Sequence, residues 1–115
     1  MLLPNCEQAF IPSAKLTDYL LSETHSVGKS KAKFFRELGF SEVNVAILEQ
    51  ELLKVARFQE VTETLVTVHG IKYVIVGTIN CPVDRTITIL TVWIIDTGQE
   101  VPRFVTARPF LETQG

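Results

Sequence analysis

The sequence predicts an α+β domain in which three N-terminal helices precede a four-stranded antiparallel meander sheet. The composition changes near residue 58: Ala, Leu, Lys and Glu dominate before it, and Val, Ile and Thr dominate after it. Apolar residues recur at helical spacing in the first part, whereas the second part alternates apolar and polar residues between turn signals. The short connections between the strands favour a meander. A chain of 115 residues suits one domain over residues 1–115.

The three helices are predicted from inner faces and end signals. Residues 1–11 read as extended, and Pro12 stands beside the first helix start, with Ser13 as its expected N-cap. A second helix is expected from about Gly28, with Gly39 just past its end. Ser41 is the expected cap of the third helix. The expected buried faces comprise Leu16, Tyr19 and Leu20, then Ala32, Phe35 and Leu38, then Val45, Leu48, Leu52 and Val55.

Four strands are predicted over residues 60–68, 71–79, 85–95 and 103–108. His69 and Gly70 signal a tight hairpin turn between the first two strands. Residues 80–84 and 96–100 read as loops, and Pro109 ends the last strand. The third strand becomes apolar on both faces, which is typical of a central strand. We expect helices on one face of the sheet and an open edge or outer face for a partner.

Bulk composition excludes several classes of protein. The net charge of −2 argues against general electrostatic attraction to nucleic acid. A local basic patch is compatible with this net charge. The N-terminus lacks the basic residues of a signal peptide, and no apolar run is long enough to span a bilayer, so we expect a cytoplasmic protein without membrane contact. Cys6 and Cys81 lie far apart and are expected to be free thiols, with a disulfide between them as the alternative. No spacing of His, Cys or carboxylates predicts a metal or another cofactor.

The most suggestive polar segment surrounds His25. Lys29, Lys31, Lys33 and Arg36 follow it on the second helix. A helix N-terminus favours an anion, a neutral histidine exchanges protons near pH 7, and Lys or Arg stabilises charge on phosphorus. These are the groups that metal-free RNA cleavage through a ribose 2′-OH requires. The alternative interpretation is a solvated loop histidine beside an exposed helix face. Gly28-Lys29-Ser30 is not a P-loop, because Glu23 stands where that motif needs its first glycine.

The later strands supply further candidates. Arg85 begins the third strand, and Trp93 lies on it, where a core position is more typical than base stacking. Thr106 is either an ordinary strand residue or a hydroxyl that positions substrate. Arg108, just before Pro109, is either a cation that reaches a cleft or a solvated side chain.

At these residues the chain resembles an uncharacterised family of small bacterial domains. The resemblance covers nearly the whole chain and rests on Leu3-Pro4-Asn5, Ile11-Pro12, Lys15-Leu16, His25, Val27-Gly28, Lys31-Ala32, Phe34-Phe35, Gly39-Phe40, Gly70, Lys72-Tyr73, Arg85, Thr91-Val92-Trp93-Ile94-Ile95-Asp96, Pro102-Arg103, Val105-Thr106-Ala107 and Pro109. Family members occur alone and as C-terminal tips of adhesin-like or polymorphic-toxin proteins. Their layout is similar to that of the barnase–EndoU–colicin–RelE toxin nucleases. The family tends to have Tyr before the final proline, where this chain has Arg108.

The resemblance implies a toxin-like, metal-independent ribonuclease domain of a toxin–antitoxin or conflict system, an endoribonuclease if it is an enzyme. It points to His25, Lys31, Arg85 and Thr106, which we expect to be catalytic, and to Trp93 as an expected substrate-binding residue. Lys29, Lys33 and Arg108 are further expected substrate-binding residues, on the residue pattern itself. The implied partners are RNA and an antitoxin or immunity protein, and a homodimer is a further expectation. The alternative function is a non-catalytic protein-interaction or oligomerisation module. Convergence of His25 and the cations on one cleft would distinguish the two.

Overall fold

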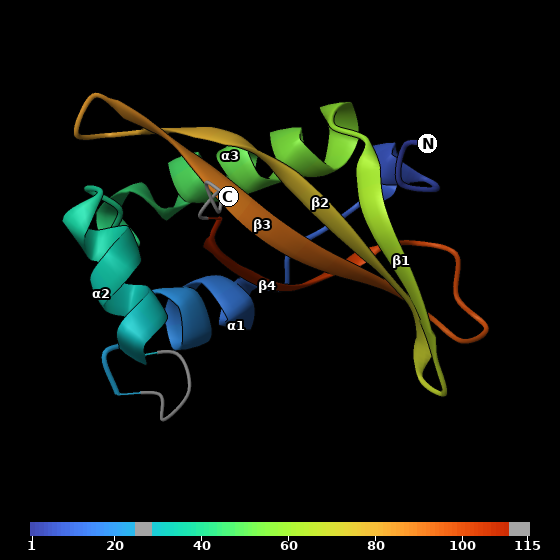
Figure 1. Ribbon diagram of the computed structural model, residues 1–115. Coiled ribbons are helices and arrows are strands. Elements are labelled where there is room, and N and C mark those ends of the chain that lie inside the picture. The colour runs from blue at the N-terminus through green and yellow to red at the C-terminus, as the bar shows by residue number, and fades with distance from the viewer. Residues whose placement is uncertain (25–28, 111–115) are drawn as a thin grey trace, which may run out of the picture.

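A computed structural model describes residues 1–24 and 29–110, and it has the predicted order of helices followed by strands (Figure 1). The first helical segment joins α1 (Ser13–Lys15) to a π-helical turn (Leu16–Leu20). Next come α2 (Lys29–Glu37) and α3 (Val45–Phe58). Short 3₁₀ turns lie at Cys6–Gln8 and Glu42–Asn44. The turn at Cys6–Gln8 interrupts the segment that we expected to be extended throughout.

The sheet is an antiparallel meander in the order β1-β2-β3-β4. Its strands are β1 (Val61–Thr67), β2 (Gly70–Cys81), β3 (Arg85–Asp96) and β4 (Arg103–Pro109). The central position expected for the third strand is confirmed. The predicted loop from residue 80 is wrong at Asn80 and Cys81, which continue β2 by pairing with Thr86 and Arg85. The turn between β2 and β3 is therefore shorter than its Pro and Asp signals indicated.

The helix ends show which local signals act. Ser41 caps its 3₁₀ turn by accepting a hydrogen bond from the backbone of Val43, and the Asn44 side chain accepts one from the backbone of Ser41. Gly39 has a φ of 96°, a value that favours glycine after a helix. The cap expected at Ser13 is wrong by one residue, because Ser13 is already helical and Pro12 stands before it. The fixed φ of proline suits that helix entry without a side-chain cap.

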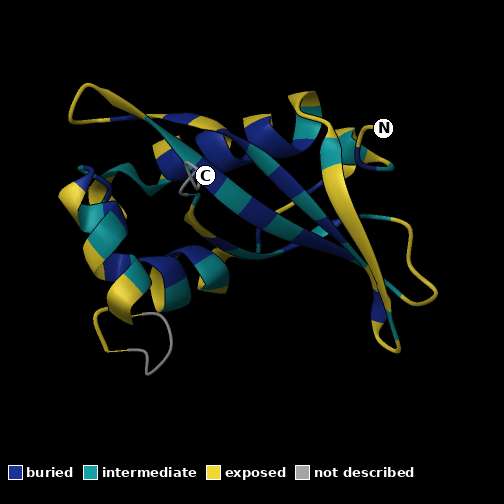
Figure 2. Cartoon of the chain, in the orientation of Figure 1, coloured by how far each residue is buried: buried dark blue, intermediate teal, exposed yellow. Residues whose placement is uncertain are grey.

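The core lies between α3 and one face of the sheet. Helix α3 packs against β2 and β3, whereas α1 packs against β4 and α2 packs against the π-helical turn. Trp93 is fully buried at the sheet centre, and its ring meets Phe104 of β4 edge-on at 5.2 Å between centroids. Figure 2 shows the buried residues along α3, β2 and β3, while β1 is exposed over almost its whole length. The helices therefore leave the two edge strands in different surroundings.

Candidate anion-binding site between α2 and β4

The candidate site forms where the first two helices meet the edge strand β4. Phe104 and Ala107 of this strand are fully buried, while Arg103, Thr106 and Arg108 are more accessible. A register shift between Val92 and Trp93 leaves one extra residue in β4, a β-bulge. Side chains on one side of a strand stand two residues apart, and the bulge inserts one more residue between Arg103 and Thr106. This places those three polar side chains in a row beside the helices.

Thr106 and Tyr19 join the strand to the π-helical turn. Their hydroxyl oxygens lie 3.0 Å apart and share a hydrogen bond. The amine of Lys15 lies 4.8 Å from the centroid of the Tyr19 ring, which is a cation–π distance. A pair of hydroxyl groups therefore stands at the middle of the row, with a cation close by.

Lys31 crosses from α2 to the same strand. Its amine donates a hydrogen bond of 3.2 Å to the backbone carbonyl of Ala107. Burial, and next to it the neighbouring Arg108 cation, lowers the pKa of the Lys31 amine from its usual range. In residues 1–24 and 29–110, no carboxylate lies within ion-pair distance of Lys31 or Arg108. Two neighbouring cations without a counter-charge favour binding of an anion.

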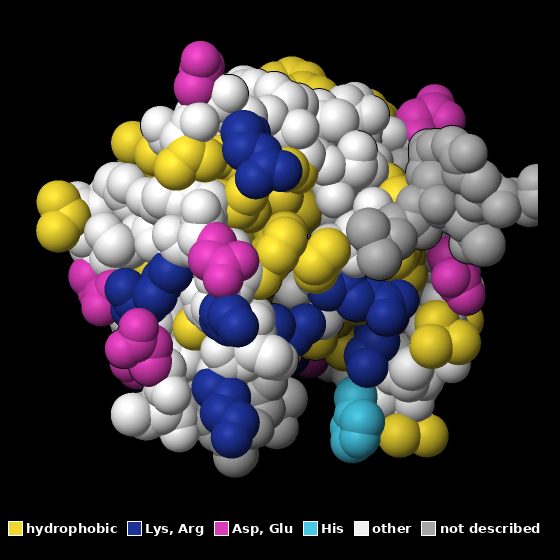
Figure 3. All heavy atoms as spheres, turned by 60° about the vertical axis from the view of Figure 1, so that its left-hand side comes forward, with side chains coloured by type: hydrophobic (Ala, Val, Ile, Leu, Met, Phe, Trp, Pro, Cys, Tyr) yellow, Lys and Arg dark blue, Asp and Glu magenta, His cyan; other side chains and the backbone are white. Residues whose placement is uncertain are grey.

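The cations continue along α2. Lys29 and Lys33 are exposed one helical turn apart, on a different face of α2 from Lys31. Figure 3 shows Lys and Arg side chains gathered in a band across this side of the molecule, with a few carboxylates among them. The acidic net charge of the chain therefore coexists with a local cationic face.

The structure does not bring every predicted site residue to this cluster. Arg85 begins β3 opposite Cys81, four residues beyond Ile89, where the pairing of β3 with β4 ends. Four residues of strand span about 13 Å, and Arg85 also lies on the opposite face of β3 from the neighbours of Thr106 and Arg108. Arg85 is therefore separate from the Lys31–Arg108 pair.

Trp93 is a core residue and does not bind substrate. Its indole N–H donates a hydrogen bond of 2.8 Å to the hydroxyl of buried Thr91, which itself donates to the carbonyl of Ile75. A side chain with no exposed surface has no ring face for a base, so the prediction of Trp93 as a substrate-binding residue is wrong. Its prediction as a core residue is confirmed. The other leading candidate, His25, lies outside the described residues.

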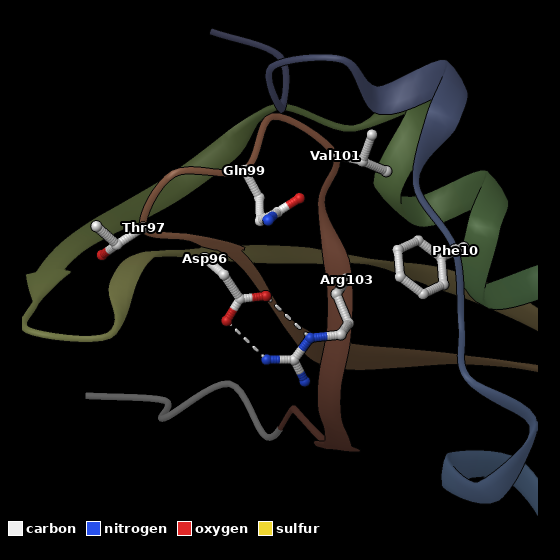
Figure 4. Close-up of a pocket in the computed structure, with 6 residues that line it drawn as sticks. All are labelled: Phe10, Asp96, Thr97, Gln99, Val101 and Arg103. Carbon is white, nitrogen blue, oxygen red and sulfur yellow. Dashed lines mark hydrogen bonds and ion pairs between the residues drawn. The ribbon is translucent and has the colours of Figure 1, made fainter.

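A second polar feature, which the sequence analysis missed, lies at the start of β4. Arg103 donates two hydrogen bonds, of 3.1 and 2.9 Å, to the two carboxylate oxygens of Asp96. This contact lowers the pKa of Asp96 and raises the pKa of Arg103. The pair lines an open pocket of about 390 Å³ together with Phe10, Thr97, Gln99 and Val101, and Figure 4 shows the guanidinium facing the carboxylate. The signal in the sequence was the Asp and Arg that flank the last predicted loop.

The chemistry of the site is that of cations and hydroxyl groups. Among the residues that the structure describes, no three His, Cys, Asp or Glu side chains gather as a metal site would need. The same described residues contain no helix that is long and apolar enough to cross a membrane. Lys31, Arg108, Thr106 and Tyr19 can together bind an oxyanion and orient it by hydrogen bonds.

These features define an α+β domain with a helical N-terminal half, an antiparallel meander and a cationic edge strand. The chain belongs to the family described as a domain of unknown function, DUF6883, whose model matches residues 2–110. A search of the curated proteins gives no match. Among solved structures, the chain is similar to a chain of a "Contact-dependent growth inhibition toxin - immunity protein complex from Klebsiella pneumoniae 342". The TM-score is 0.71 at 14% identity, over 94% of this chain and 98% of that one, which shows a shared fold.

Proposed function

We propose that this domain is a toxin-like, metal-independent ribonuclease of a toxin–antitoxin or conflict system. The observation that carries the proposal is the pair of neighbouring cations Lys31 and Arg108, which has no carboxylate partner among the described residues and lies beside the Tyr19–Thr106 hydroxyl pair. The fold shared with a chain of a toxin–immunity complex supports the toxin-like context. An antitoxin or immunity protein is then the expected partner, and the cytoplasm, where RNA is found, is the expected place of action.

The proposed reaction needs no bound metal. A base removes the proton of a ribose 2′-OH, the oxygen attacks the adjacent phosphorus, and the bond from phosphorus to the 5′-oxygen breaks. The products are a 2′,3′-cyclic phosphate and a 5′-OH, which receives a proton from an acid. In this scheme His25 exchanges the protons, Lys31 and Arg108 stabilise the charge on the phosphoryl oxygens, and Thr106 positions the substrate. Lys29 and Lys33 extend the attraction to neighbouring phosphates. Arg85, at the other end of β3, has at most a remote contact with the substrate in this scheme.

Anion binding is the first step to test. Phosphate or sulfate should raise the midpoint of thermal unfolding of the wild-type protein, since a ligand that binds only the folded state stabilises it. Lys31→Met and Arg108→Gln should each reduce this rise. Lys54→Met is the matched control, because Lys54 already pairs with Glu51 at 2.9 Å. An equal rise in all four proteins would contradict a site at Lys31 and Arg108.

Catalysis is the second step. Induced expression without a cognate partner should arrest bacterial growth, and the purified protein should cleave RNA in the presence of a chelator. His25→Ala should lower the cleavage rate by about 10²–10⁴-fold, which is typical of an acid–base group. Lys31→Met should lower it by about 10²–10³-fold through lost charge stabilisation. Diverse RNAs left intact by the purified wild-type protein would contradict the nuclease proposal.

The alternative is a non-catalytic protein-interaction or oligomerisation module. The observation that favours it is the exposed strand β1, where five consecutive residues, 62–66, are exposed. A binding module would retain its partner after substitution of Lys31 or His25, whereas the nuclease would lose its activity. Growth assays and partner binding measured on the same variants therefore distinguish the two functions.

A further inference from the structure

The two edges of the sheet differ in how their backbone groups are covered. At β4, the N–H of Phe10 donates to the carbonyl of Pro102, and the N–H of Phe104 donates to the carbonyl of Phe10. Farther along the strand, Lys31 donates to the carbonyl of Ala107. Together these contacts occupy the outer edge of β4 along much of its length. This edge is therefore protected from pairing with another chain.

The outer edge of β1 is open. Thr67 pairs with Gly70 across a two-residue turn, so the antiparallel alternation directs the backbone groups of Thr64 and Val66 away from β2. In residues 1–24 and 29–110, the outer side of β1 makes one backbone hydrogen bond, from the N–H of Val61 to the carbonyl of Met1. The strand beyond that point carries backbone donors and acceptors without a protein partner in the described chain.

The side chains of this edge do not oppose pairing. Natural sheets protect an open edge with Lys, Pro, bulges or very short strands. The bulge of β1 lies at its beginning, between Val61 and Glu63, and Glu63 is the only charged residue of the strand. Leu65 is 53% exposed, and Val66 is 75% exposed on the other face. Figure 2 shows this exposed strand beside the buried residues of β2 and β3.

We propose that two copies of this chain pair through antiparallel β1 strands, with the twofold axis at Leu65. This register places Leu65 opposite its own copy and Val66 opposite Thr64, so that apolar side chains are buried on both faces. It also places Glu63 opposite Thr67. An axis at Glu63 would set two carboxylates directly opposite each other, and an axis at Thr64 would set Glu63 opposite Leu65. The axis at Leu65 avoids both unfavourable contacts.

The pairing joins two meanders into one continuous sheet of eight strands. Thr64 and Val66 of each copy exchange four backbone hydrogen bonds with Val66 and Thr64 of the other. The β4 edges remain at the two outer ends of this sheet, so the cluster around Lys31 and Arg108 stays accessible in each copy. The dimer is independent of the proposed ribonuclease activity.

Sedimentation measurements on the wild-type chain test the pairing. A dimer that dissociates on dilution is expected. Leu65→Lys and Thr64→Pro should each raise its dissociation constant at least tenfold, by adding a charge on the axis or by removing an outward N–H. Proline is tolerated where the N–H of an edge strand faces away from the sheet, so Thr64→Pro should remain folded. Thr78→Lys, at an exposed position of β2, is the control and should remain dimeric. A wild-type chain that stays monomeric at 100-fold the lowest concentration that sedimentation can detect would overturn the proposal. This holds even if another protein binds this edge.

Cross-linking tests the register. Residues at a twofold axis lie about 4.5 Å apart between Cα atoms when the pair is not hydrogen-bonded, which a disulfide spans. Leu65→Cys should therefore form a covalent dimer under mild oxidation. Glu63→Cys should not, because four residues of offset separate the two copies by about 13 Å. In all samples the native Cys6 and Cys81 are replaced by Ser, so that only the introduced cysteine can cross-link. Equal cross-linking of both variants, or cross-linking of Glu63→Cys alone, would overturn the register.

Discussion

The edge strands β1 and β4 belong to one sheet, yet the outer edge of β4 is covered by other segments and that of β1 is open. The N-terminal segment and α2 cover β4 with backbone and side-chain hydrogen bonds, and they bring Tyr19 and Lys31 to its residues Thr106 and Ala107. In the part of the chain that the structure describes, the outer edge of β1 makes one backbone hydrogen bond, to the carbonyl of Met1. A covered edge can hold side chains in fixed positions for binding or chemistry. An open edge offers backbone groups, which recognise another strand.

Both edge strands depend on the same central core, so substitution of Trp93 should have the largest effect. Trp93→Ala removes a fully buried indole and its contact with Phe104, so the free energy of unfolding should fall by about 3–5 kcal/mol. Denaturant titration measures this loss. Amide exchange should accelerate in β1 and β4 alike, and a change confined to one edge would show that the edges unfold independently.

Thr91→Val makes a smaller change in the same core. The valine preserves the shape of the side chain, but it leaves the buried indole N–H of Trp93 without its acceptor. A buried polar group without a partner costs about 1–3 kcal/mol, so the free energy of unfolding should fall by that amount. Trp93→Phe should cost less in the Thr91→Val background than in the wild type, because there it also removes the unpaired N–H. Equal costs in the two backgrounds would assign the loss to the bond between Thr91 and Ile75.

Much of the fold could be predicted from sequence because its signals are local. The helical stripe of Ala32, Phe35 and Leu38 is buried, and the expected hairpin forms. Its turn lies one residue earlier than predicted, at Val68 and His69, because Gly70 already pairs with Thr67. The errors occur where long-range pairing overrides local signals. Asn80 and Cys81 read as loop residues, but pairing with β3 keeps them in β2.

The site was less predictable than the fold. Lys31, Thr106 and Arg108 were all candidates, and the structure brings them to one strand. Arg85 was grouped with them on the family resemblance, but the register of the sheet places it beyond the end of β4. The covered edge of β4 depends on the bridge between Phe10 and Arg103, which joins residues far apart in sequence. No periodicity predicts such a pairing.

A matched pair of proline variants compares the edges directly. Phe10→Pro should lower the free energy of unfolding by about 0.5–1.5 kcal/mol more than Phe10→Ala does, because it also removes the hydrogen bond to Pro102. Thr64→Pro, measured in dilute protein where the chain is monomeric, should lower the free energy of unfolding by less. The N–H of Thr64 that it removes points away from the sheet. Equal costs at the two positions would show that the bridge at Phe10 does not stabilise β4.

The smallest expected effect concerns the Asp96–Arg103 pair, which joins the end of β3 to the start of β4. The pKa of Asp96 is lowered in the folded protein by the hydrogen bonds from Arg103, so the unfolded chain binds a proton more readily. The pair therefore stabilises the fold above pH ~4, the usual range of a free aspartate, and this contribution disappears as the pH falls through the lower folded pKa. Both side chains are 35% exposed, which limits the contribution to about 0.2–1 kcal/mol.

Arg103→Gln should lower the free energy of unfolding at pH 7 by that amount, and its difference from wild type should shrink during acid titration below pH ~4. Arg85→Gln is the control, because the described residues give Arg85 no ion pair, and its difference from wild type should stay constant over the same pH range. If the difference in the free energy of unfolding for Arg103→Gln is constant as well, Arg103 stabilises β4 through packing, and its charge does not contribute to the stability of this edge.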